Sequence, residues 1–165
     1  MNRRLFFAVF PAALATGCGF QLRRLDGIPF ASLYIDAPPD SAVAQRVIAA
    51  FKTNKATRLT ASAAEAEAVL KLDKEKRTKT ILSLSGAGRV TEYRLGLNMG
   101  YTISGKNELT LAVPEVIELS RDLTYDDAQL LAKSAEEGLL YRDMEDDATR
   151  RILRRLQSIK PGNGS

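Results

Sequence analysis

The sequence contains no histidine, no tryptophan and a single cysteine, Cys18. Histidine is the commonest general base and metal ligand, so its absence excludes Ser-His-Asp and Cys-His catalytic sets. One cysteine cannot form an internal disulfide or a cysteine-based zinc site. A Ser-Lys dyad stays open on residue types alone, but no local motif indicates one. We therefore expect no enzyme activity, no metal and no cofactor.

A strong excess of one charge is also missing. The 165 residues carry a formal net charge of +4, and two of the positive charges are Arg3 and Arg4 at the start of the chain. The total charge therefore does not predict a nucleic-acid partner, because such binding needs cations that cluster on one surface. A composition of 45% hydrophobic and 27% charged residues is typical of one globular domain.

The N-terminus has the pattern of a bacterial export signal over residues 1–17. Arg3 and Arg4 form its positive part, residues 5–15 form an uncharged apolar run, and small residues follow. The run is shorter than the roughly 20 apolar residues that a membrane-spanning helix needs. We expect this segment to be removed rather than to stay as an anchor.

The end of this segment, Ala15-Thr16-Gly17-Cys18, resembles a lipobox. In such signals the cysteine is acylated and the chain is cut before it. Leucine is usual where Ala15 stands, so a general secretory signal with an incidental cysteine is the alternative. Two or three acyl chains at Cys18 would anchor the protein firmly. Gly19, in place of the aspartate that resembles an inner-membrane retention signal, predicts the outer membrane, with the body in the periplasm.

The mature chain shows helical and strand periodicity in a clear order. Apolar residues at helical spacing predict a helix around 43–51 and a long one over 128–156. A strict period of two over 93–103 predicts a strand with one buried and one wet face, and Pro114 in the return strand must lie at an edge or a bulge. Shorter strands are expected at 33–36, 57–61 and 68–72, and residues 74–79 interrupt the pattern before 81–84.

These elements predict an α/β (α+β) fold in which two amphipathic helices cover one face of a mixed, mostly antiparallel sheet. Residues 18–160 form one domain, and 161–165 form a flexible tail. Asp143 and the acidic run 145–147 fan around the last helix. They favour a solvated face over a metal cluster.

Basic residues are the stronger candidates for a binding function. Several crowd the segment before the turn at 86–88, and Arg89, Arg94 and Lys133 follow it in the sequence. An anionic partner such as lipopolysaccharide phosphate would suit these groups. A plain solvated face is the alternative.

Three stretches resemble one family, the lipopolysaccharide-assembly lipoproteins of the LptE type. They are GCGFQLR (17–23), TEYRLGLNMGYTI (91–103) and LAKSAEEGLLYRDMEDDATRRILRRLQSI (131–159). The resemblance implies two helices on a four-stranded sheet and a role without catalysis. It also implies a plug that sits in an LptD-type outer-membrane β-barrel, helps the barrel assemble and binds lipopolysaccharide for delivery to the outer leaflet.

The same resemblance implies two basic positions that bind lipopolysaccharide. One falls on Lys133. The other falls near Gly86, which is not basic, so Arg89 three residues later is the candidate substitute. Two other functions stay open: a periplasmic lipoprotein enzyme acting on envelope polymers, and an envelope-binding lipoprotein adaptor with no role in lipid transport.

Overall fold

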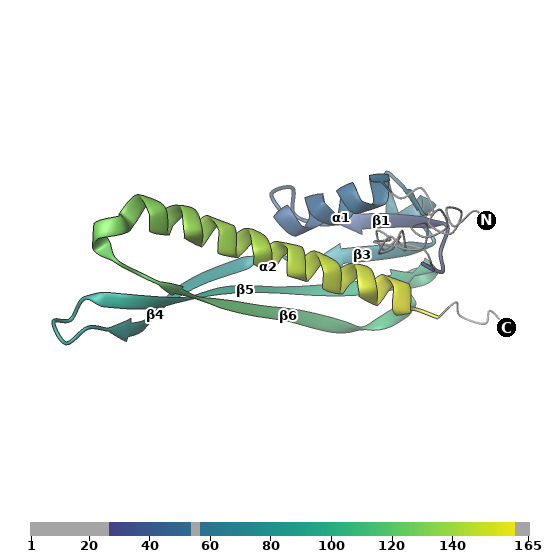
Figure 1. Cartoon of the computed structure of the whole chain (residues 1–165). Helices are drawn as coiled ribbons and strands as arrows, with labels where there is room; N and C mark the ends of the chain where they lie inside the picture. The colour runs from purple at the N-terminus through teal and green to yellow at the C-terminus, as the bar shows by residue number, and fades with distance from the viewer. Residues whose placement is uncertain (1–26, 54–56, 161–165) are drawn as a thin grey trace, which may run out of the picture.

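Two helices cover one face of an open β-sheet in the computed structural model, which describes residues 27–53 and 57–160 (Figure 1). The predicted signal peptide 1–17, Cys18 and the tail 161–165 lie outside these residues. The elements are β1 (Ser32–Asp36), α1 (Ala42–Thr53), β2 (Arg58–Leu59), η1 (Ala63–Glu65), β3 (Ala68–Leu72), β4 (Lys76–Leu84), β5 (Val90–Gly105), η2 (Lys106–Glu108), β6 (Thr110–Thr124), η3 (Asp127–Gln129) and α2 (Leu130–Ser158).

The sheet is mixed and mostly antiparallel, as expected, but it has six strands instead of four. β6 pairs along one edge of β5, while β3 and β4 share the other edge, opposite residues 101–105 and 90–98 respectively. β1 adds in parallel to β3, and the two-residue β2 adds in parallel to β1. The predicted class is therefore confirmed, and the predicted number of strands is wrong.

One of the two additional strands arises because residues 73–75 separate β3 from β4 along the same edge of β5. Glu75 leaves the sheet there, and its carboxylate accepts hydrogen bonds from the Ser41 hydroxyl and the Val43 N–H, both at 2.8 Å. Ser41 Oγ also accepts from the Ala44 N–H at 2.9 Å, so Ser41 caps the start of α1. The interruption is shorter than the expected 74–79, because pairing with β5 resumes at Lys76.

Pro114 lies both in an edge strand and at a bulge, so both possibilities for it are confirmed. β6 pairs only with β5, and the register shifts between the pairs Tyr101–Glu115 and Ile103–Ala112. The missing N–H of proline therefore costs no ladder hydrogen bond. The last helix begins later than predicted, because Asp126 caps the short turn η3 by accepting from the Ala128 N–H at 3.0 Å.

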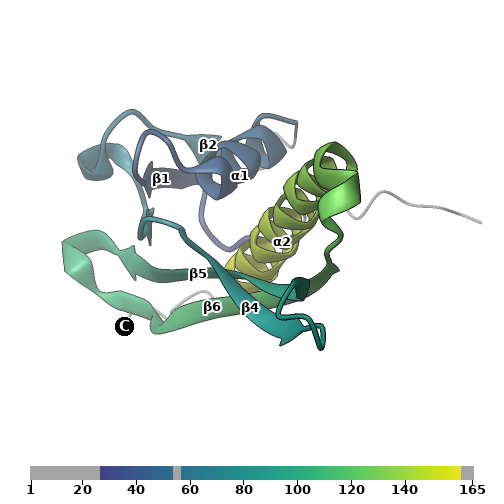
Figure 2. The ribbon, with the colours of Figure 1, turned by 90° about the vertical axis from the view of Figure 1, so that its left-hand side faces the viewer.

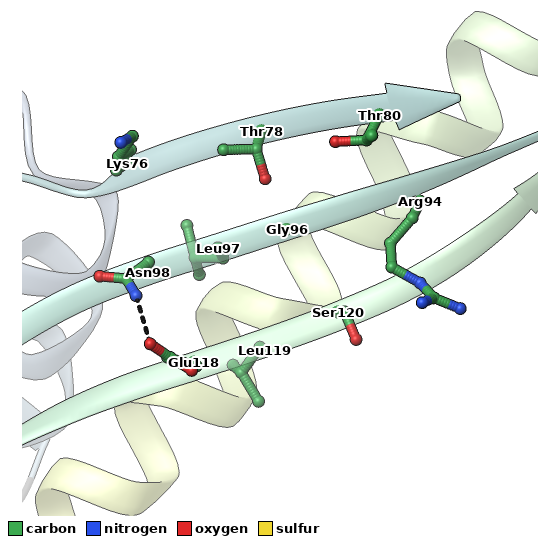
Figure 3. A pocket seen from close by; sticks show the side chains of 10 residues that line it. All are labelled: Lys76, Thr78, Thr80, Arg94, Gly96, Leu97, Asn98, Glu118, Leu119 and Ser120. Carbon is green, nitrogen blue, oxygen red and sulfur yellow. Dashed lines mark hydrogen bonds between the residues drawn. The ribbon is translucent and has the colours of Figure 1, made fainter. Parts of the chain in front are cut away.

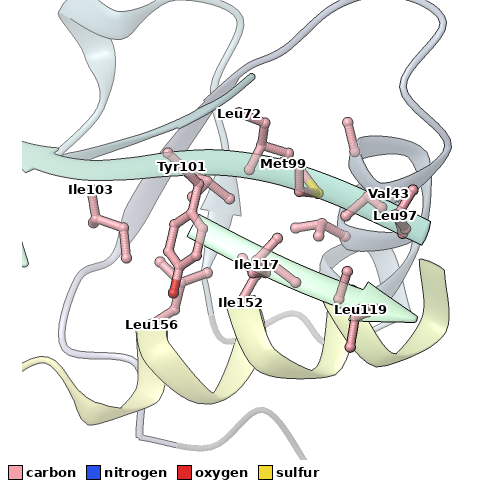
Figure 4. Close-up of a cluster of buried hydrophobic side chains, with 14 of the residues drawn as sticks. Val43, Leu72, Leu97, Met99, Tyr101, Ile103, Ile117, Leu119, Ile152 and Leu156 are labelled. Carbon is pink, nitrogen blue, oxygen red and sulfur yellow. The ribbon is translucent and has the colours of Figure 1, made fainter. Parts of the chain in front are cut away.

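The core lies between the sheet and the helices, which share one face (Figure 2). Every second side chain of β5 points into it, and α2 contributes residues three and four apart (Figure 4). In the part of the chain that the structure describes, the opposite face of the sheet carries no helix. The main core residues are Val43, Val47, Leu95, Leu97, Met99, Tyr101, Ile103, Met144, Ala148, Ile152 and Leu156.

Replacing Ile152 by alanine is expected to lower the free energy of unfolding by about 3 kcal/mol, because the buried side chain leaves a cavity between α2 and the sheet. Urea denaturation followed by circular dichroism measures the loss. Arg154→Ala, at an exposed site on the same helix, is the control and should stay within about 0.5 kcal/mol of the unchanged protein. Equal losses in both variants would contradict this account of the core.

One acidic residue of α2 is buried, contrary to the predicted solvated face. The Glu145 side chain is 4% exposed and bridges Arg46 of α1, at 2.8 Å, and Arg77 of β4. Asp143 and Asp146 are exposed, as expected. The interpretation failed at Glu145 because a helical pattern does not show which arginines of other elements will reach a given carboxylate. The cluster ties both helices to the sheet.

Candidate functional site

One end of the molecule brings together the turn between β4 and β5, the end of β6 and the first turns of α2 (Figure 1). Ser85 N–H donates to the Arg89 carbonyl at 2.7 Å and closes the turn, in which Gly88 has a positive φ of 76°. Tyr125 N–H donates to the Thr91 carbonyl at 2.8 Å, so the end of β6 lies beside the start of β5. We call this end, residues 79–93 and 124–137, the tip.

Both predicted lipopolysaccharide-binding residues lie at the tip. Arg89 directly precedes β5 and is exposed, and it makes no ion pair with any residue that the structure describes. Lys133 lies in the first turns of α2, where its ammonium donates to Glu136 at 2.9 Å and its side chain is 16% exposed. The fold thus places two cations distant in sequence at one end, and one of them already has an acidic neighbour.

A third cation of the tip lies beside two aromatic rings. The Lys79 ammonium lies 4.4 Å from the centroid of Tyr93 and 5.8 Å from that of Tyr125. It donates to Glu137 at 2.6 Å, and this hydrogen bond is the main reason why the pKa of Lys79 is raised. The two rings pack edge to face, with centroids 5.1 Å apart. Alternation places Tyr93 on one face of β5, but only the pairing of β5 with β6 brings Tyr125 to it.

Large apolar side chains also remain exposed at the tip. They come from both β4 and α2, and Leu131 is the most exposed of them at 87%. Exposed apolar side chains that gather at one end of a protein mark an interaction site. Beside cations they suit an amphiphile with anionic groups and hydrocarbon chains. These residues are Ile81, Leu82, Leu84, Leu130 and Leu131.

The other basic residues of this region do not join the tip. Arg77 pairs with buried Glu145, and Lys74 lies 3.4 Å from Asp40. Arg94 holds Asp122 with two hydrogen bonds of 2.8 and 3.0 Å, which lowers the pKa of that carboxyl. Of these three cations, Arg77 pairs with a buried carboxylate and so links β4 to α2, whereas the pairs of Lys74 and Arg94 lie at the surface.

A shallow groove of about 630 Å³ crosses the face of the sheet that carries no helix (Figure 3). Seven of its ten lining residues are polar, and Asn98 of β5 donates to Glu118 of β6 at 3.0 Å across the floor. Gly96 keeps the groove open, because a Cβ there would come within 2.4 Å of Thr78 Oγ1. The lining residues are Lys76, Thr78, Thr80, Arg94, Gly96, Leu97, Asn98, Glu118, Leu119 and Ser120.

Residues 27–53 and 57–160 contain no helix that is long and apolar enough to cross a membrane. The same residues hold no group of three or more acidic side chains placed to bind a metal ion.

Comparison with known proteins gives consistent results in sequence and in structure. Residues 30–156 match the family model LptE, described as lipopolysaccharide-assembly. The LPS-assembly lipoprotein LptE of Photorhabdus laumondii is 28% identical over 152 residues, which cover 90% of this chain and 82% of that protein.

Solved structures agree. An uncharacterized lipoprotein B from Nitrosomonas europaea superposes with a TM-score of 0.73 at 35% identity, over 85% of this chain and 91% of that one. The rare lipoprotein B from Shewanella oneidensis superposes with a TM-score of 0.67 at 27% identity, over 77% and 94%. The family match covers most of the chain and all of its paired strands, and on this ground the chain belongs to the LptE lipopolysaccharide-assembly family.

Proposed function

We propose that this protein is an outer-membrane lipoprotein that binds lipopolysaccharide and plugs an LptD-type β-barrel. It helps that barrel assemble and assists delivery of lipopolysaccharide to the outer leaflet. The observation that carries the proposal is the tip, where Arg89, Lys133 and exposed apolar side chains from two elements gather at one end. Lipopolysaccharide combines phosphate groups with acyl chains, which are the two chemistries that this surface offers.

The plug role is supported by the shape and polarity of the fold. The lumen of a large outer-membrane barrel is polar, so a protein inside it needs a polar surface. The groove face of the sheet meets this need in part, since seven of the ten residues that line the groove are charged or polar. The molecule is also elongated along β5 and β6 (Figure 1), which suits a channel.

The anchor in this proposal is lipid on Cys18, and no catalytic residue takes part. An acylated Cys18 places the protein on the membrane, and Gly19 permits transport to the outer membrane. The structure describes neither residue, so the support is the lipobox-like stretch 15–18 and the family membership.

Lys133→Asp is expected to weaken lipopolysaccharide binding by about tenfold or more, because a charge-assisted hydrogen bond is lost and a repulsive charge is added. Titration of purified lipopolysaccharide against both proteins measures the change. Arg89→Asp should act in the same direction. Glu136→Gln should strengthen binding, since Glu136 competes with phosphate for the Lys133 ammonium.

The matched control is Lys52→Asp, an exposed lysine in the last turn of α1, outside the tip. It changes the net charge by the same amount and should leave affinity nearly unchanged. Equal weak binding by all variants would instead favour an envelope-binding adaptor without a role in lipid transport. Purification from outer membranes tests the partner, and repeated absence of a large barrel protein would contradict the plug role.

A further inference from the structure

The end of the molecule opposite the tip contains the hairpin between β5 and β6. Ala68 pairs with both Leu33 of β1 and Gly105 of β5, so the start of β1 lies two strands away from this hairpin. With strands about 4.8 Å apart, the separation is roughly 10 Å. α2 also ends here (Figure 1). We call the hairpin segment, residues 104–113, the base.

The base exposes apolar side chains that none of the described residues covers. Leu109, directly after the turn, is 66% exposed, and Val113 is 72% exposed. Val113 lies in the bulged part of β6, where the register with β5 is lost, so it does not join the core. Lys106 begins the turn, is exposed, and makes no ion pair within the described ranges.

The length of chain before the structure limits what can cover the base. Eight residues, 19–26, separate Cys18 from Gly27, the first described residue. Even fully extended, they reach about 30 Å. β5 alone has 16 residues and is therefore about 50 Å long. A lipid on Cys18 can therefore lie next to the base. The tip is one length of β5 away from the base, which is farther than residues 19–26 can reach.

We propose that, before the protein enters the barrel, the base rests on the phospholipid surface into which the acyl chains of Cys18 insert, with the tip directed away from that surface. Leu109 and Val113 enter the interfacial layer, and Lys106 lies among the headgroup phosphates. A small contact is sufficient, because the acyl tether holds the base at high effective concentration near the lipid. The inference rests on the proposed anchoring through Cys18.

The absence of tryptophan allows a direct test. The mature chain 18–165 carries one thiol, Cys18, which can be coupled to a maleimide-bearing phospholipid whether or not cells acylate it. Leu109→Trp reports on the base, and Leu131→Trp, at the most exposed apolar site of the tip, is the matched control. Both proteins are tethered to vesicles of phosphatidylethanolamine and phosphatidylglycerol with brominated acyl chains, which quench tryptophan that enters the bilayer.

Tryptophan at 109 is expected to lose most of its fluorescence, while tryptophan at 131 keeps it. Val113→Trp is a second reporter and should follow 109. Equal quenching at both ends, stronger quenching at 131, or no quenching at 109 and 113 would each overturn the inference. Mass spectrometry of the chain made in cells tests acylation of Cys18 separately, so failure of the anchor and failure of the base contact are distinguishable.

Discussion

The double variant Arg46→Leu/Arg77→Leu is expected to unfold with a free energy about 3 kcal/mol lower than that of the unchanged protein. The two guanidinium groups are the partners of Glu145, whose side chain is 4% exposed. Without them a carboxylate stays in the interface between α1, α2 and the sheet and has lost its compensating charges. This loss of free energy is at the low end of the range for breaking a buried ion pair, because both arginine side chains are themselves partly exposed. Urea denaturation followed by circular dichroism measures it.

Two further variants separate charge from packing in this cluster. The triple variant Arg46→Leu/Arg77→Leu/Glu145→Leu should regain much of the lost stability, since an apolar cluster of similar volume replaces a buried ion pair at little cost. Arg94→Leu removes one arginine of an exposed pair with Asp122 and should change little. If the double and triple variants were equally unstable, lost packing of the arginine side chains, and not the unpaired carboxylate, would be the cause.

The largest functional effect is expected from Cys18→Ala, which should move nearly all of the protein from the membrane fraction to the soluble periplasmic fraction. The reason is that acyl chains on Cys18 are the proposed anchor, and no helix of the described residues can cross a membrane. The measurement is cell fractionation with immunodetection, together with mass spectrometry of the mature N-terminus of the unchanged protein.

Gly19→Asp is the matched control for this prediction. It keeps the acylated cysteine but supplies the residue that resembles an inner-membrane retention signal. The variant should therefore stay in membranes and shift from the outer to the inner one. An unmodified Cys18 in the unchanged protein, or a mature chain that begins elsewhere, would refute the anchor itself and not only the sorting.

The candidate site could be predicted from the sequence only in part. Lys133 and Arg89 were identified from the family resemblance, and the fold places both at the tip. The contact of Lys79 with the rings of Tyr93 and Tyr125 was missed, because it depends on the register of three strands. The exposed leucines of the tip were missed for a similar reason. An alternating or helical pattern shows which side chains share a face, but it does not show how far along the element that face is covered by the rest of the protein.

What the sequence alone determined is the local structure and the kind of fold. The strict alternation over 93–103, the helical spacing of the last helix and the position of Pro114 all depend on neighbouring residues, and each is confirmed. Composition acts in the same way: without histidine no Ser-His-Asp or Cys-His set can form, and one cysteine cannot form an internal disulfide, whatever the fold.

Tertiary structure decided what depends on contacts between distant segments. Glu145 becomes buried because Arg46 and Arg77 reach it from two other elements. Glu75 lies in the break between β3 and β4, where its carboxylate accepts hydrogen bonds from Ser41 and Val43 at the start of α1. Most cations of the crowded segment are paired, and only the packing of α2 over the sheet leaves Arg89 and Lys133 at one end. Charge and hydrogen-bond partners separated by tens of residues are set by the fold as a whole, so no local pattern in the sequence records them.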